Sequence, residues 1–175
     1  SLNGERCTSS SRALVEASIY EEFAKRAAER VKKIKVGHPL DPSTEIGPLI
    51  HPRHVEKVLS YVDAARSAGA TVAVGGGRAN GGKGNFVEPT LYTNARNDMK
   101  IAQEEIFGPV TGVIPYDSEE EAIAIANDSE FGLSGGVYTN DTDRAYAVAR
   151  RIRTGHFTQN GREFDLTNPF GGFKK

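Results

Sequence analysis

Short apolar runs alternate with amphipathic stretches along almost the whole of this 175-residue chain. The apolar runs are partly β-branched, which is typical of buried strands. We expect strands at 13–19, 70–74, 86–92, 110–116, 135–139 and 156–160. The stretches between them place apolar residues on one helical face and predict helices at 20–36, 51–68, 99–104, 119–128 and 141–153. This alternation favours an α/β fold, a mostly parallel sheet with helices on both faces.

Composition limits the partners that such a fold would have. Hydrophobic residues make up 38% and charged residues 26%, which indicates one globular domain over 1–175. A formal net charge of −1 gives no general attraction to nucleic acid or to an anionic membrane. No apolar run approaches the roughly 18 residues of a membrane span, and no signal peptide is visible. We therefore expect no nucleic acid and no membrane as partners.

The single cysteine, Cys7, stands in the polar segment that opens the chain. One cysteine rules out an internal disulfide, which fits a reducing compartment, and we expect a cytoplasmic protein. A thiol reacts as its thiolate, whose formation is favoured at a helix N-terminus or beside a cation. Thr8 and the serines after it are residue types that start helices, while Arg6 and Arg12 supply positive charge. The alternative is a buried cysteine that acts as a small hydrophobic residue.

Three motifs resemble the aldehyde dehydrogenase superfamily. Residues 3–12, Asn-Gly-Glu-Arg-Cys-Thr-Ser-Ser-Ser-Arg, resemble its active-site cysteine segment, in which Gly-x-x-Cys is followed by a basic residue. Residues 104–110, Glu-Glu-Ile-Phe-Gly-Pro-Val, resemble its cofactor-ribose motif, and residues 168–174, Asn-Pro-Phe-Gly-Gly-Phe-Lys, its C-terminal motif. Because the motifs occur in the family's order over almost the whole chain, the chain is identified as a member, namely as the catalytic domain that bears the cysteine.

The resemblance implies an NAD(P)-dependent oxidation of an aldehyde to a carboxylic acid. The Cys7 thiolate would attack the carbonyl carbon to form a thiohemiacetal. The backbone N–H of Cys7 would hold the oxyanion, together with a side-chain amide from another segment. Transfer of hydride to NAD(P)+ would leave a thioester on Cys7, which an activated water would hydrolyse.

The same resemblance assigns the cofactor-binding residues. Glu105 would accept hydrogen bonds from the hydroxyls of the nicotinamide ribose, and Phe107 would flank the nicotinamide. Lys57 matches a lysine that contacts the cofactor, and His54, three residues before it, stands where several members have Gln. The structural alternatives are a surface or capping Glu105, a core Phe107 and a solvated helix face for His54 and Lys57. No metal site is expected.

The substrate pocket is expected near the end of the chain. Phe170 in the last motif would form a wall beside substrate and nicotinamide. Phe164 precedes it in a loop that varies among members with aldehyde specificity, and is the candidate substrate-lining aromatic residue. Asn160 matches an asparagine that ends the preceding strand, and we expect a structural role for it.

Other parts of the family's active site lie outside these residues. The general-base Glu, the oxyanion Asn and the dinucleotide-binding domain lie upstream of the cysteine in the family, and a strand used in oligomer contacts lies after the last motif. We therefore expect a piece of a longer, homo-oligomeric enzyme, in which NAD or NADP is bound mainly by the absent domain. The isolated chain should neither bind NAD tightly nor turn over aldehydes.

Two other functions and one subtype remain open from the residues. A cysteine-dependent hydrolase without nucleotide would pair Cys7 with His38, His51, His54 or His156. A non-catalytic interaction module would keep the fold without the chemistry. Within the family, the acyl group can pass to coenzyme A instead of water. The aldehyde, and the choice between NAD and NADP, are not determined by these residues.

Overall fold

The computed structural model of the chain describes residues 2–161, 167 and 169–174. They divide into two compact units, residues 1–117 and residues 118–175. The single domain expected over 1–175 stays a prediction. Among the described residues, no helix has both the length and the apolar character that crossing a membrane requires.

The strands are mostly parallel. In the described part of residues 1–117, one sheet has the strand order β1-β4-β3-β2, and in residues 118–175 β5 pairs with β6. β4 runs parallel to both β1 and β3, β2 is antiparallel to β3, and β5 is parallel to β6. The strands are β1 Arg12–Glu16, β2 Thr71–Val74, β3 Thr90–Thr93, β4 Val110–Tyr116, β5 Ser134–Val137 and β6 His156–Gln159.

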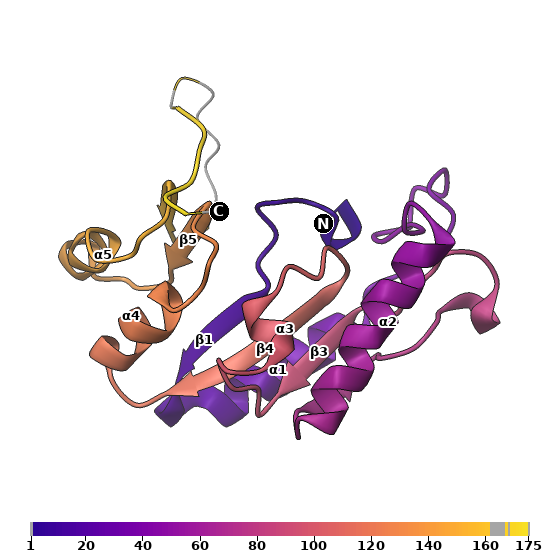
Figure 1. Cartoon of the computed structure of the whole chain (residues 1–175), viewed down its shortest axis with the longest axis horizontal. Coiled ribbons are helices and arrows are strands. Elements are labelled where there is room, and N and C mark those ends of the chain that lie inside the picture. Colours follow the sequence, from indigo (N-terminus) through magenta and orange to yellow (C-terminus); the bar gives the residue numbers. More distant parts are fainter. Residues whose placement is uncertain (1, 162–166, 168, 175) are drawn as a thin grey trace. The chain divides into compact units, whose positions relative to one another are not determined.

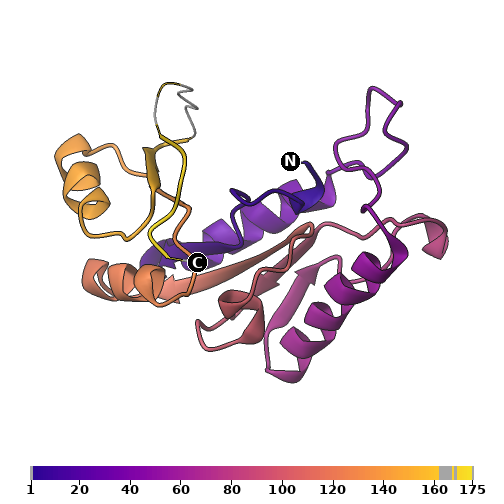
Figure 2. The same ribbon diagram turned by 45° about the horizontal axis from the view of Figure 1, so that its top comes forward.

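Helices cover both faces of the larger sheet. In Figures 1 and 2, α1 lies on one face, and α2 and α3 lie on the other. The helices are α1 Tyr20–Lys32, α2 Pro52–Ser67, α3 Lys100–Gln103, α4 Glu119–Asn127 and α5 Thr142–Ala149. Short 3-10 turns occur at Leu2–Gly4, Ala17–Ile19 and Asn80–Gly82. The predicted α/β class, with a mostly parallel sheet, is confirmed.

Successive residues of β3 face opposite layers of the core, as the alternation of a strand requires. Leu91 packs with Val15, Tyr20 and Val113 on the α1 side. Tyr92 is fully buried on the opposite face of the sheet, where charged residues of α2 act electrostatically on its hydroxyl. Burial raises the pKa of Tyr92 to about 12. The sheet therefore has an apolar layer on each face, which explains its apolar and β-branched strand sequences.

Side-chain caps begin three of the helices where the sequence suggests. The His51 ring accepts from Arg53 N at 3.1 Å before Pro52, the first residue of α2. The Ser118 hydroxyl accepts from Glu121 N at 3.2 Å, and Asp141 accepts from Arg144 N at 2.9 Å. Each cap satisfies an N–H group that has no partner within its helix.

Several elements are shorter than predicted because their terminal residues bond elsewhere. β1 ends at Glu16, since 17–19 form a 3-10 turn leading into α1. α1 ends at Lys32 rather than at 36, because Val36 forms a β-bridge with Ile46. α5 ends at Ala149 rather than at 153, where the Asn127 side chain bonds the backbone of Arg151 and Arg153.

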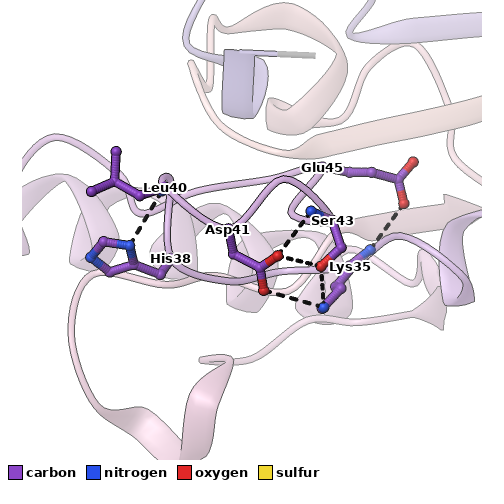
Figure 3. Close-up of polar contacts among 6 residues, drawn as sticks. All are labelled: Lys35, His38, Leu40, Asp41, Ser43 and Glu45. Carbon is purple, nitrogen blue, oxygen red and sulfur yellow. Dashed lines mark hydrogen bonds and ion pairs between the residues drawn. The ribbon is translucent and has the colours of Figure 1, made fainter.

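The connector between α1 and α2 is ordered by side chains (Figure 3). Asp41 accepts from the backbone N–H of Ser43 at 2.9 Å and from its hydroxyl at 2.5 Å, and Lys35 lies 3.3 Å from the second oxygen of Asp41. These bonds, those from Ser43 foremost, lower the pKa of Asp41 from 3.8 to about 2. Leu40 N donates to His38 Nδ1 at 3.3 Å. These hydrogen bonds give the loop before α2 a defined conformation.

Candidate active site

Cys7 lies near the tip of a β-turn. Ser9 N donates to Arg6 O at 2.9 Å, so Cys7 and Thr8 occupy the two central positions. The Cys7 side chain is exposed, whereas Thr8 is buried. The chain passes from this turn through residues 9–11 into β1, so the hydroxyl residues do not begin a helix, and the strand expected after them is observed. The buried alternative for Cys7 is wrong, and its sulfur is open to a reagent from solvent.

The groups around the turn leave Cys7 accessible. In the described part of the chain, no group bonds its backbone N–H, and no histidine bonds its sulfur. Arg12 donates to Asn97 Oδ1 at 2.5 Å, which fixes this cation at the start of β1. An unengaged N–H beside an exposed thiol is the arrangement that an oxyanion at the attacked carbon would need.

The segment before the turn is tied to the loop that leads into α2. Gly47 N donates to Asn3 Oδ1 at 2.8 Å, and Asn3 Nδ2 donates to Pro48 O at 3.0 Å. Ile50 N donates to Glu5 Oε1 at 3.1 Å. The turn therefore starts from a base that is fixed by hydrogen bonds on both sides of Gly4.

Gly4 brings this base into backbone contact with residues 104–108, which we call the cofactor segment. Gly4 has φ +72°, and a Cβ there would lie 2.0 Å from Gly108 O. Figure 1 shows the N-terminal turn beside the loop between α3 and β4. A Cβ on Gly108 would lie 2.7 Å from Val58 of α2. Two glycines thus allow the cysteine segment, the cofactor segment and α2 to pack together.

One face of α2 bonds the cofactor segment along its length. Side chains spaced three and four residues apart share a helix face. Tyr61 OH donates to Glu104 Oε2 at 2.8 Å, and Lys57 Nζ donates to Glu105 O at 3.3 Å. Nε2 of His54 lies 2.6 Å from Phe107 O. The helix and the segment run in opposite directions, so these three bonds fix the position of the segment on α2.

The hydrogen bonds to α2 leave the Glu105 carboxylate of the cofactor segment exposed. Ile106 is 4% exposed and anchors the segment in the core. The neighbouring Glu105 is exposed, and within the described residues its carboxylate has no partner. Phe107 is half-buried and has φ +60°. A carboxylate without a partner can accept hydrogen bonds from a diol, and the aromatic residue beside it offers a ring that could pack on a flat ligand group.

Tyr61 anchors the cofactor segment within a charged cluster. It is buried, and Lys57 and Lys100 lie 5.9 Å and 5.1 Å from its ring centroid. Burial first, and then the hydrogen bond to Glu104, raise the pKa of Tyr61 to about 12. The phenol therefore stays a donor to Glu104 at neutral pH.

The predicted pocket residues belong to the other unit. Phe164 lies outside the described residues. Phe170 is 54% exposed, and its ring centroid lies 5.3 Å from that of His156. Asn160 donates to Thr139 O at 2.8 Å and accepts from Thr139 N at 2.9 Å, which closes the end of the β5–β6 pair. Among the described residues, no three His, Cys, Asp or Glu side chains form a group that could hold a metal ion.

Comparison with known proteins identifies the family. The profile of the Aldehyde dehydrogenase family matches residues 1–175. The chain belongs to the aldehyde dehydrogenase family. It is 44% identical to betaine aldehyde dehydrogenase from Brucella anthropi over 178 residues, covering 98% of this chain and 36% of that protein.

Solved aldehyde dehydrogenase structures have the same fold. The Mycobacterium tuberculosis aldehyde dehydrogenase in complex with NAD+ has a TM-score of 0.96 and 43% identity, over 98% of this chain and 36% of that chain. HpcC from Thermus thermophilus has a TM-score of 0.94 and 49% identity, over 98% of this chain and 35% of that chain. This aldehyde dehydrogenase chain thus spans about a third of the length of the relatives that it matches.

The structure brings together three of the predicted site residues and adds others. Lys57, Glu105 and Phe107 lie on α2 and the segment bonded to it, and the base of the Cys7 turn contacts that segment through Gly4. Asn3, Glu5 and Tyr61 were not predicted as site residues, and the solvated face favoured for His54 is wrong. The spacing His54-Lys57-Tyr61 was the available signal, because it places all three on one helix face.

Proposed function

We propose that this chain is the cysteine-bearing part of an NAD-dependent aldehyde dehydrogenase that oxidises a small-molecule aldehyde to a carboxylic acid. Family membership supports the reaction class. Structural similarity to the M. tuberculosis aldehyde dehydrogenase, which was solved in complex with NAD+, supports NAD as the cofactor. The observation that best supports the proposal is the contact between Gly4 and Gly108. It brings the segment with the exposed Cys7 thiol against the segment whose Glu105 carboxylate has no partner among the described residues.

Cys7 is the proposed nucleophile. Its thiolate attacks the aldehyde carbon to form a thiohemiacetal, and its own backbone N–H, which no described group engages, donates to the oxyanion. NAD, when bound, supplies the acceptor for the hydride. The resulting thioester on Cys7 is then cleaved by water, which returns the thiol and releases the acid.

The cofactor segment is proposed to bind the nicotinamide half of NAD. Glu105 accepts from the two ribose hydroxyls, an arrangement that a carboxylate with two oxygens suits. Phe107 holds the ring at one side, and Lys57 keeps the Glu105 backbone in place through its bond to the carbonyl oxygen. Phe170 and Phe164 are proposed to line the aldehyde pocket. The choice between NAD and NADP depends on groups beyond this segment.

The experiment compares the isolated chain with the whole protein. We expect no NAD reduction by the isolated chain with a panel of aldehydes, and turnover by the whole protein. C7A in the whole protein should lower turnover roughly 10⁴-fold or more. Its melting temperature should stay within a few degrees of the wild type, because the side chain is exposed. S10A, at another exposed residue of the segment, is the control.

Turnover that survives C7A would overturn the proposal. Ester hydrolysis without NAD would favour the hydrolase, for which the structure offers no histidine bonded to Cys7 in its described part. A whole protein that binds NAD but lacks turnover in both forms would favour the non-catalytic module. Release of acyl-coenzyme A in place of the acid would move the protein to the other subtype.

Assembly and location are further proposals. We propose a cytoplasmic homo-oligomer. One cysteine supports a reducing compartment. Tyr138 and Tyr146 are 82% and 68% exposed, and large apolar side chains of this kind are typical of surfaces that a subunit covers. Sedimentation of the whole protein, with Y138S and Y146S as variants, tests the assembly.

A further inference from the structure

We propose that His54 is a positioning residue, which couples the cysteine segment to the cofactor segment by holding Phe107 O while Glu5 faces its ring. The inference rests on the proposed function and deepens it. His54 does not need to contact substrate or cofactor in this role. It sets the position of Phe107, and through Glu5 it responds to the base of the cysteine turn.

The contact to Phe107 defines the hydrogen-bonding state of His54. A carbonyl oxygen only accepts, so the Nε2 atom at 2.6 Å must carry the proton and donate. The side chain of His54 is 16% exposed, and a donor with so little access to water has a strong preference for this single partner. His54 is therefore oriented, rather than lying on a solvated helix face.

Phe107 needs such a bond because of its backbone. Its φ of +60° lies in the left-handed region, which a side chain with a Cβ adopts at a cost. The backbone is held from α2 by the His54 bond to the carbonyl, and the next residue, Gly108, packs on Val58 of the same helix. Loss of the donor would release the residue whose ring is proposed to flank the nicotinamide.

Glu5 extends the coupling to the cysteine segment. Its Oε1 lies 3.6 Å from Nε2 of His54 and accepts from Ile50 N at 3.1 Å. The Glu5 side chain is 16% exposed, so its charge acts on the imidazole with little screening. Glu5 precedes Cys7 by two residues, which links the nucleophile's turn and the cofactor segment through one imidazole.

The test uses three variants of the whole protein. H54L keeps a similar volume without a donor, H54Q keeps an N–H donor, and H51L removes a histidine that only caps α2. NAD+ affinity is measured by calorimetry without aldehyde, and kcat and KM for NAD+ are measured separately. We expect H54L to raise the dissociation constant and the KM about tenfold, as for the loss of one well-formed hydrogen bond. H54Q should stay within about twofold of the wild type.

The control separates positioning from stability. H51L should lower the melting temperature and leave the NAD+ dissociation constant unchanged, because the cap has no contact with the cofactor segment in the described structure. Wild-type affinity in H54L, or equal losses in H54L and H54Q, overturns the proposal. A wild-type whole protein without NAD+ binding would instead refute the proposed function.

A second variant keeps the test valid where H54L does not fold. E5Q retains an acceptor for Ile50 N–H and removes the charge that faces the imidazole. In the protein that keeps His54, we expect E5Q to weaken NAD+ binding about threefold. In the H54Q protein the effect of E5Q should be clearly smaller, since an amide responds less than an imidazole to the charge of Glu5. Equal effects in the two backgrounds would show that Glu5 does not act through His54.

Discussion

The cysteine turn, residues 6–9, and the cofactor segment, residues 104–108, are linked by the contact of Gly4 with Gly108 but are held in different ways. α2 bonds the cofactor segment at Glu104, Glu105 and Phe107. The turn is fixed through the residues on either side of it. Asn3 and Glu5 before it bond the loop that leads into α2, and Ser11 O after it accepts from Gly112 N, while the thiol stays exposed. A cofactor-binding surface gains affinity from groups that are already in place. A nucleophile needs an open approach for its substrate, so the two arrangements agree with the roles proposed for these segments.

The largest effect is expected where the two regions meet. G4A should destabilise the whole protein by about 3 kcal/mol or more, because the new Cβ would lie 2.0 Å from Gly108 O at a φ of +72°. G81A is the matched control, at φ +61° with open space around it, and should cost only about 1 kcal/mol. Urea denaturation gives both values. Equal losses would mean that the two segments separate easily.

The next effect concerns the cofactor segment alone. E105Q keeps the shape of the side chain and removes its charge, so we expect a tenfold to hundredfold weaker NAD+ complex. The rate of Cys7 alkylation by iodoacetamide without NAD+ should stay as in the wild type. E29Q, at an exposed position on α1, is the control. A large change in alkylation rate would show that Glu105 acts on the thiol rather than on the cofactor.

A smaller effect tests how firmly α2 holds the segment. Y61F removes the hydrogen bond to Glu104 and leaves the ring near Lys57 and Lys100, which should cost about 1 kcal/mol of unfolding free energy. Urea denaturation measures the loss, and S60A on the neighbouring exposed turn of α2 is the control. If Y61F weakened NAD+ binding as strongly as E105Q, the phenol would have to act on the cofactor directly.

The smallest effect is expected in the connector between α1 and α2, which belongs to neither of the two regions. The pKa of Asp41 is lowered to about 2, so its ionised form is favoured in the folded state. Its stabilising effect is therefore complete above about pH 4 and is lost as the pH falls toward 2. The urea midpoints of wild type and D41N should differ slightly at pH 6, and the difference should shrink as the pH falls through 2. A difference that stays constant over this range would have a cause other than this charge.

The sequence predicts the elements well because their signals are local. β4 has the predicted bounds, and Ser118 and Asp141 begin their helices as the residue types suggest. Element ends were less accurate, because a distant partner decides them: Val36 leaves α1 for a bridge with Ile46, and Asn127 bonds the residues after α5.

The residues of the site were predictable only where they match the family, and the contacts between them were not. Cys7 and Glu105 were named from the motifs and Lys57 from its match to a lysine of the family, and their assigned roles stay predictions. The contact of His54 with Phe107 O was not predicted, because the helix spacing shows which face His54 occupies but not which carbonyl oxygen, here 53 residues away, it will bond. The strand after the cysteine turn was predicted from its apolar residues, and the pairing of β1 with β4 extends the chain from Arg12 onward.

The parallel pairing of β1 with β4 also sets the order in which the site can form. β4 follows β1 by more than ninety residues in the sequence, and Gly108 follows Gly4 by a similar distance. During synthesis the thiol leaves the ribosome long before its neighbouring strand exists, since long-range pairings form last. For that interval the segment that carries the cysteine lacks its contacts with β4 and with the cofactor segment, and its thiol is open to oxidation.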